Sequence, residues 1–173
     1  MQNQAQAKIA TPGNVRALEG SLAAQGVRVG IVVSRYHQDV TGRMLAAAVQ
    51  ALSENGGRPE DVEVLFVPGS FEIPLAVDRA AQTGRFDALV ALGCLIQGET
   101  IHMRIIAREV ARGILATMQA SGIPVGFGLL TVNTHDQAME RSGGKAGNKG
   151  RDAALAAIEM VNLLNGLAAP VEA

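Results

Sequence analysis

A chain of 173 residues with a formal net charge of −1 has the length of one domain, and its acidic and basic side chains nearly balance. A chain with this balance lacks the excess of basic residues that is typical of proteins that bind nucleic acid or a membrane surface. The few aromatic residues, four Phe, one Tyr and no Trp, exclude a stacking platform for several bases. The single cysteine, Cys94, excludes an internal disulfide and a cysteine-based metal cluster.

Residues 1–14 are polar and lack the basic and apolar blocks of a secretory signal. No apolar run reaches the length that spans a membrane. We therefore expect a cytoplasmic protein in which residues 1–14 form a flexible tail and residues 15–173 form a single domain.

The first half of the chain alternates between strand and helix patterns. Residues 16–20 are expected to form a short edge strand or to dock on a neighbouring copy, and residues 27–33 form the first strong strand. Asp39 or Thr41 is expected to cap the helix that follows, which the run Asn55-Gly56-Gly57 ends. The next strand spans residues 62–67, and the turn after it opens a helix that runs to about residue 84.

The second half repeats this alternation. A fully apolar strand over residues 86–93 precedes a helix from His102 to about residue 120, and a fourth strand spans residues 123–131. Glycines 126 and 128 in that strand indicate that another element or a ligand approaches closely. A short helix begins at Thr134 and ends near residue 142. A glycine-rich link over residues 143–150 leads to a final helix over residues 152–165.

Strands and helices that alternate through short connections predict an α/β fold with three αβα layers. In this sandwich a single parallel sheet carries helices on both faces. Ligands of such sheets bind at the carboxyl ends of the strands.

The segment from Gly93 to His102 leaves a buried strand and opens a helix, and it carries the strongest functional signal. Gly98 allows the backbone to approach a phosphate closely, and the free amides of a helix start attract anions. At that positive helix end His102 is expected to be a neutral imidazole that can transfer protons near neutral pH. The competing interpretation is a helix capped by Thr100 with His102 as a surface residue.

Other strand ends and loops carry weaker signals. Tyr36 either stacks on a planar ligand or is a partly buried packing residue. Glu72 either caps a helix or binds a polyol or a ring nitrogen of a ligand. Lys145 and Lys149 lie among glycines that suit a phosphate or a solvated loop. Their sequence matches neither a P-loop nor a dinucleotide fingerprint.

Three further side chains give no sign of a metal or covalent site. His37 and His135 have no partner at the spacing of a zinc site. Cys94 follows a buried strand, which favours a small apolar packing residue over a nucleophile. Together the strand-end residues indicate a pocket for a planar hydroxylated molecule and a phosphorylated one.

Three segments, in this order, resemble the 6,7-dimethyl-8-ribityllumazine synthase family: residues 67–74 (VPGSFEIP), 91–102 and 140–150 (ERSGGKAGNKG). The resemblance extends from about residue 28 to residue 164. It implies a flavodoxin-like sheet and the penultimate step of riboflavin biosynthesis. In that step 5-amino-6-(D-ribitylamino)uracil and 3,4-dihydroxy-2-butanone 4-phosphate condense without a metal or organic cofactor.

The resemblance also implies roles for individual residues. His102 is the proton-transferring histidine, and Lys149 is a lysine of the catalytic site. The implied substrate contacts are the stacking ring of Tyr36; the ribityl-holding turn of Ser70, Phe71 and Glu72; the backbone of Cys94, Leu95 and Ile96; the phosphate-side amides of Glu99 and Thr100; the phosphate-binding Arg141; and Phe127, which lines the site from a neighbouring subunit.

The chain departs from the family pattern at several of these positions. Tyr36 stands where Phe or Trp is usual, His37 where Asn is usual and Gly144 where Thr is common. Around the site histidine, Ile101, Met103 and Arg104 replace the usual Pro, Phe and Asp. Arg104 is expected to disfavour the imidazolium form of His102.

The resemblance implies a homopentamer with active sites between adjacent subunits, which in some members closes into an icosahedral capsid of sixty subunits. Two small-molecule substrates are the implied partners, with no nucleic acid and no membrane. Two other functions stay open: a flavin- or lumazine-binding or shell-forming paralogue with little turnover, and an archaeal-type riboflavin synthase.

Overall fold

The computed structural model describes residues 11–13 and 15–168. The predicted flexible tail, residues 1–14, therefore lies almost wholly outside the described residues. None of the helices in these ranges is long and apolar enough to cross a membrane.

Four parallel strands form the central sheet in the order β2-β1-β3-β4. They span Val29–Ser34 (β1), Val62–Val67 (β2), Ala88–Ile96 (β3) and Val125–Val132 (β4). In the register, Val29 lies between Val62 and Ala88. The two inner strands are buried along nearly their whole length because helices cover both faces of the sheet.

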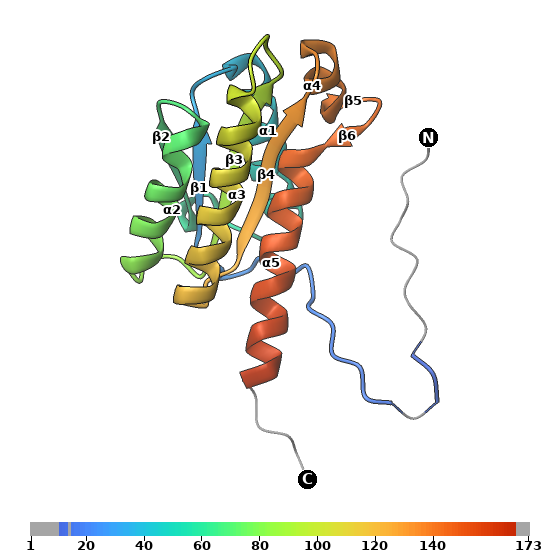
Figure 1. The fold of residues 1–173 in the computed structure, drawn as a ribbon. Coiled ribbons are helices and arrows are strands. Elements are labelled where there is room, and N and C mark those ends of the chain that lie inside the picture. The colour runs from blue at the N-terminus through green and yellow to red at the C-terminus, as the bar shows by residue number, and fades with distance from the viewer. Residues whose placement is uncertain (1–10, 14, 169–173) are drawn as a thin grey trace.

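Two long helices pack on each face, which confirms the predicted three layers (Figure 1). One face carries α1 (Gln38–Glu54) and α5 (Lys149–Ala168), and the other carries α2 (Ile73–Gln82) and α3 (His102–Ser121). Short elements complete the chain: the 3-10 helices η1 (Pro59–Asp61) and η2 (Ser70–Glu72), helix α4 (His135–Arg141), and the antiparallel pair β5 (Ser142–Gly144) and β6 (Gly147–Asn148).

The predicted edge strand over residues 16–20 is absent, since residues 15–24 have no regular secondary structure. This segment instead lies along α5. The Asn162 side chain donates hydrogen bonds to the carbonyls of Ser21 and Ala23, at 2.8 and 2.9 Å. Gly20 also packs against the Glu159 carbonyl, where a Cβ atom would collide with the oxygen.

The predicted caps of α1 are wrong. The helix begins after His37, which adopts a left-handed conformation with φ 57°, and no side chain caps it. The His37 carbonyl accepts bonds from the amides of Val40 and Thr41, both at 2.9 Å, and the Thr41 hydroxyl also donates to it. The left-handed residue turns the chain sharply from β1 into α1, so Thr41 is drawn into the core and Asp39 is left free to reach another helix.

Two boundaries differ from the predictions because of tertiary contacts. Strand β3 continues past Gly93 to Ile96, since β4 runs beside it over those residues. Helix α5 begins at Lys149 rather than residue 152, because the Asn148 side chain accepts the Gly150 amide at 2.9 Å and caps the helix. The prediction for Gly126 and Gly128 is confirmed: a Cβ atom on Gly126 would collide with a carbonyl oxygen of α5.

Candidate functional site

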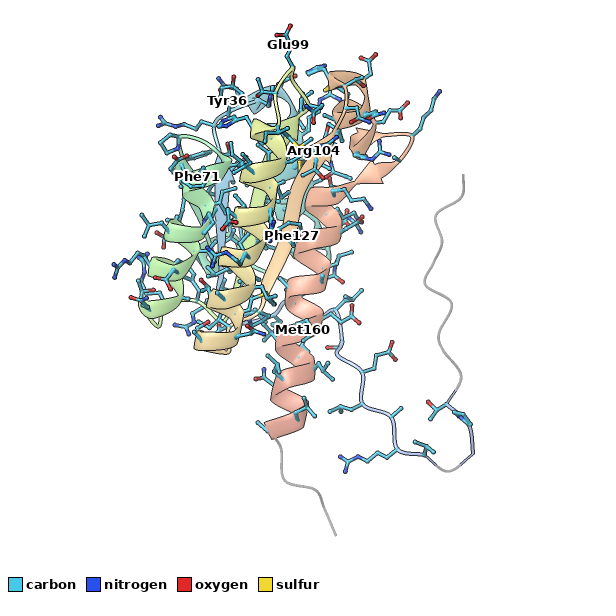
Figure 2. The ribbon with its side chains drawn as sticks, viewed as in Figure 1. Tyr36, Phe71, Glu99, Arg104, Phe127 and Met160 are labelled. Carbon is cyan, nitrogen blue, oxygen red and sulfur yellow. The ribbon has the colours of Figure 1, made fainter. Side chains whose placement is uncertain are left out.

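An open cavity of about 950 Å³ lies at the carboxyl ends of β1, β2 and β3. The turns that follow these strands supply its walls, together with the first turns of α3 and the start of α4. Figure 2 shows Tyr36 and Glu99 at this end of the molecule. The lining residues are Tyr36, His37, Gly69, Ser70, Phe71, Glu72, Cys94, Leu95, Ile96, Gly98, Thr100, His102, Met103, Ile105, Ile106 and His135.

Most of the residues that the sequence assigned to the site meet in this cavity. Two exposed aromatic rings, Tyr36 and Phe71, flank it, with 67% and 59% of their surface open. Such exposure is unusual for large rings and leaves ring surface available to a planar ligand. The other predicted members in the cavity are Ser70, Glu72, Cys94, Leu95, Ile96, Thr100 and His102.

Two polar side chains of the turn after β2 face this space. The Ser70 hydroxyl is buried, and it is the one buried side-chain polar atom without a hydrogen-bond partner in the described residues. A buried hydroxyl of this kind is expected to bond a ligand or water. Glu72 stands before α2 but makes no capping hydrogen bond there, so its exposed carboxylate is free to accept bonds from a ligand.

The loop between β3 and α3 is folded back by its own side chains. Gln97 Nε2 donates to the carbonyls of Gly98 and Thr100, at 2.6 and 2.9 Å. The Thr100 hydroxyl accepts the His102 amide at 3.3 Å, whereas the residue at the cap position of α3, Ile101, offers no side-chain cap. This helix start lies beside the cavity, where its positive end favours an anion.

Two side chains of this region point away from the cavity. Glu99 projects from the tip of the loop, so only its backbone is close to the site (Figure 2). Arg104 is two positions beyond His102 and exposed. Arg104 does not belong to the residues that line the cavity, and residues two apart on a helix do not face one another.

Cys94 is fully buried in the core beneath the cavity, which confirms it as a packing residue. Burial, with a smaller contribution from the Asp39 carboxylate, raises the pKa of its thiol to about 11. A thiol that stays protonated at neutral pH is a poor nucleophile.

Three predicted site residues lie elsewhere. Phe127, Arg141 and Lys149 line a separate hollow of about 210 Å³ on β4, the strand at the free edge of the sheet. The Phe127 ring is half exposed, Arg141 donates to the Gln137 carbonyl at 3.1 Å, and Lys149 pairs with Asp152 at 2.7 Å. Figure 2 shows Phe127 well below the end of the sheet that carries Tyr36.

Sequence reasoning missed two histidines of the cavity. All three histidines of the chain, His37, His102 and His135, line the same cavity. His135 Nε2 lies 2.6 Å from Asp39 Oδ2, and this hydrogen bond lowers the pKa of the Asp39 carboxyl. The sequence did contain a signal that could have placed all three histidines in the cavity, because each of them follows a predicted strand.

In the described ranges, no group of three His, Cys, Asp or Glu side chains is arranged to hold a metal ion.

Comparison with known proteins adds an independent finding. The profile of the 6,7-dimethyl-8-ribityllumazine synthase family matches residues 26–165. A protein from Desulfatibacillum aliphaticivorans named 6,7-dimethyl-8-ribityllumazine synthase is 49% identical to this chain over 148 residues. The match covers 86% of this chain and 96% of that relative.

Proposed function

The chain belongs to the 6,7-dimethyl-8-ribityllumazine synthase family and condenses 5-amino-6-(D-ribitylamino)uracil with 3,4-dihydroxy-2-butanone 4-phosphate; we propose that it does so in a site that two neighbouring copies build together. The cavity at the strand ends supplies one half of this site. The hollow on β4 of the next copy supplies the other half.

The cavity suits the heterocyclic substrate. Tyr36 offers an open ring for the pyrimidine, while Glu72 and the unpartnered hydroxyl of Ser70 offer bonds to the ribityl chain. Strand β1 pairs with β3 only as far as Leu92. The backbone groups of residues 94–96 that face β1 are therefore free to bond the edge of the ring.

The start of α3 and the hollow suit the phosphorylated substrate. The amides of Glu99 and Thr100 precede a helix whose positive end favours a phosphate. Arg141 and Lys149 of the neighbouring copy add two cations, and a guanidinium binds phosphate in a bidentate manner. Lys149 has to exchange its carboxylate partner, Asp152, for the substrate.

In the proposed mechanism the amine of the uracil attacks the ketone and a first water leaves to give a Schiff base, after which phosphate leaves as an enol forms. The intermediate then closes the second ring with loss of water. Holding the two reactants side by side supplies the largest share of the acceleration, roughly 7–11 kcal/mol in favourable cases. His102, at the cavity edge, transfers protons and adds about 10²–10⁴-fold.

The exposed aromatic residues carry the argument for a shared site. Of the five aromatic residues, only Phe86 is buried, while Tyr36, Phe66, Phe71 and Phe127 are at least half exposed. Large exposed rings mark surfaces that association or a ligand covers. The assembly that we propose is a cytoplasmic homopentamer, with a sixty-subunit icosahedral shell as its larger form.

The first experiment mixes the purified full-length protein with both substrates and follows the fluorescence of the lumazine product. A rate no higher than the uncatalysed background would refute the enzyme and favour a binding or shell-forming paralogue.

A second experiment tests the sharing between copies. His102→Ala and Arg141→Ala are each assayed alone and after co-assembly in equal amounts. If one copy supplies the cavity and the next the hollow, random mixing restores about a quarter of the wild-type sites. No recovery above the two single variants would show that both halves belong to one copy.

A further inference from the structure

We propose that the Asp39–His135 pair is a brace that positions the turn Tyr36-His37 and so sets how the Tyr36 ring meets the heterocyclic substrate. The inference rests on the proposed function, because it assigns Tyr36 to substrate stacking. Asp39 and His135 act as positioning residues in it.

The turn that carries Tyr36 is strained. His37 has φ 57° and ψ 50°, and it is the sole non-glycine residue with positive φ in the described ranges. Left-handed backbone is unfavourable for a residue with a side chain and persists where the surroundings hold it in place. The Tyr36 ring and the His37 imidazole lie nearly perpendicular to one another, with ring centroids 4.7 Å apart, so a shift of His37 changes the surroundings of the Tyr36 ring.

The start of α1 lacks the usual means of fixing such a turn. The His37 side chain makes no capping hydrogen bond, and the Asp39 carboxylate accepts bonds from the amides of Asp39 and Val40 in its own turn. The Thr41 hydroxyl bonds back to the carbonyl of His37 within the same segment. Among the hydrogen bonds of the described residues, the Asp39–His135 bond is the one that joins a side chain of residues 36–41 to a different helix. It ties the first turn of α1 to the first residue of α4.

The bond also spans the site. Strand β3 lies between β1 and β4 in the sheet, so a link from α1 to α4 passes over the end of β3. Consistent with this path, the Asp39 carboxylate lies close enough to Cys94 of β3 to raise the pKa of its thiol. His135 itself also lines the cavity.

The exposure of the pair argues against a role in global stability. The side chains of His135 and Asp39 are 52% and 53% exposed, and polar pairs this open contribute little to folding. The bond is expected to affect the local geometry of the cavity more than the stability of the fold, because it limits the positions that the strained turn can adopt.

Tyr36 provides a direct readout, since the chain has no other Tyr and no Trp. The experiment measures the anisotropy of tyrosine fluorescence and its quenching by acrylamide in Asp39→Ala, His135→Ala and the double variant, without substrate. We expect lower anisotropy and stronger quenching in all three. The double variant should be no worse than either single variant, because each change breaks the same bond.

The matched control is Glu54→Ala. It breaks the Glu54–Arg151 ion pair at the other end of α1, which also measures 2.6 Å and is about as exposed. The control should leave the fluorescence of Tyr36 unchanged, which separates a local brace from a general weakening of α1.

Steady-state kinetics test the consequence for the substrate. With the brace broken, we expect the KM for the ribitylaminouracil to rise roughly five-fold, the loss expected of one hydrogen bond, with kcat nearly unchanged. Unchanged anisotropy, quenching and KM in an active enzyme would overturn the brace and leave the proposed function standing. A wild-type protein without turnover would overturn the proposed function, while the fluorescence would still report on the brace.

Discussion

Replacing Gly150 by alanine is expected to destabilise the protein strongly, although alanine is the better helix former. Gly150 lies in the first turn of α5, buried against α1. A Cβ atom built there would stand 2.1 Å from the Met44 carbonyl oxygen, while ordinary van der Waals contact begins at 3.4 Å. The clash is with backbone, which cannot rotate aside, so α1 and α5 have to separate by more than an ångström.

The size of the loss follows from this geometry. Overpacked cores lose typically about 1–3 kcal/mol, and a clash between two backbones belongs at the upper end of that range. For a chain of this length, about 3 kcal/mol corresponds to a melting temperature lower by roughly 6–12 °C.

The assay compares urea midpoints of wild type, Gly150→Ala and Gly42→Ala at one protein concentration, because association shifts apparent stability. Gly42 lies in α1 with no atom near a built Cβ, so alanine there should stabilise the protein by about 0.5–1 kcal/mol. The two substitutions are chemically identical and differ in the space around them. A Gly150→Ala variant as stable as wild type would refute the reasoning.

Three shorter predictions concern single side chains. Since burial raises the Cys94 thiol pKa from 9.0 to about 11, a disulfide reagent at pH 8 should modify native protein about 100-fold more slowly than urea-unfolded chain, and equal rates would contradict this. Arg28 lowers the pKa of Asp87 below 3.8 through hydrogen bonds of 2.7 and 3.0 Å, so this stabilisation is complete above pH 3.8 and is lost as the pH falls through the lower, folded pKa. Asp87→Asn should therefore lower the urea midpoint at pH 7 and match wild type once the pH has fallen below the folded pKa of Asp87; a gap that persists there would exclude the charge as its cause. Arg141→Lys should raise the KM for the butanone phosphate roughly ten-fold with little change in kcat, as loss of a bidentate contact predicts, and an unchanged KM would remove Arg141 from the phosphate site.

The sheet could be predicted from sequence because its strands are short apolar runs bounded by polar turns. The predicted range 62–67 coincides with β2, and the rule that ligands bind at strand ends placed Tyr36, Glu72 and His102 in one region. The extension of β3 to Ile96 escaped prediction because it depends on pairing with β4, which no local pattern encodes.

The Asp39–His135 pair shows a different limit. Its two members stand 96 positions apart, and each alone reads as an ordinary polar residue at a helix start. The left-handed His37 was equally hidden, because a residue with a side chain rarely adopts that conformation. Phe127, in the middle of an edge strand, came only from the family resemblance, since the strand-end rule does not reach it.

The two halves of the proposed site depend on different parts of the fold. The cavity is built by turns at strand ends, whereas Arg141 and Lys149 flank a short hairpin, β5 and β6, whose Asn148 side chain donates to the Arg43 carbonyl of α1 at 3.2 Å. The packing of α1 against α5 therefore sets the position of the phosphate side. Core changes there, Gly150→Ala included, should therefore raise the KM for the butanone phosphate.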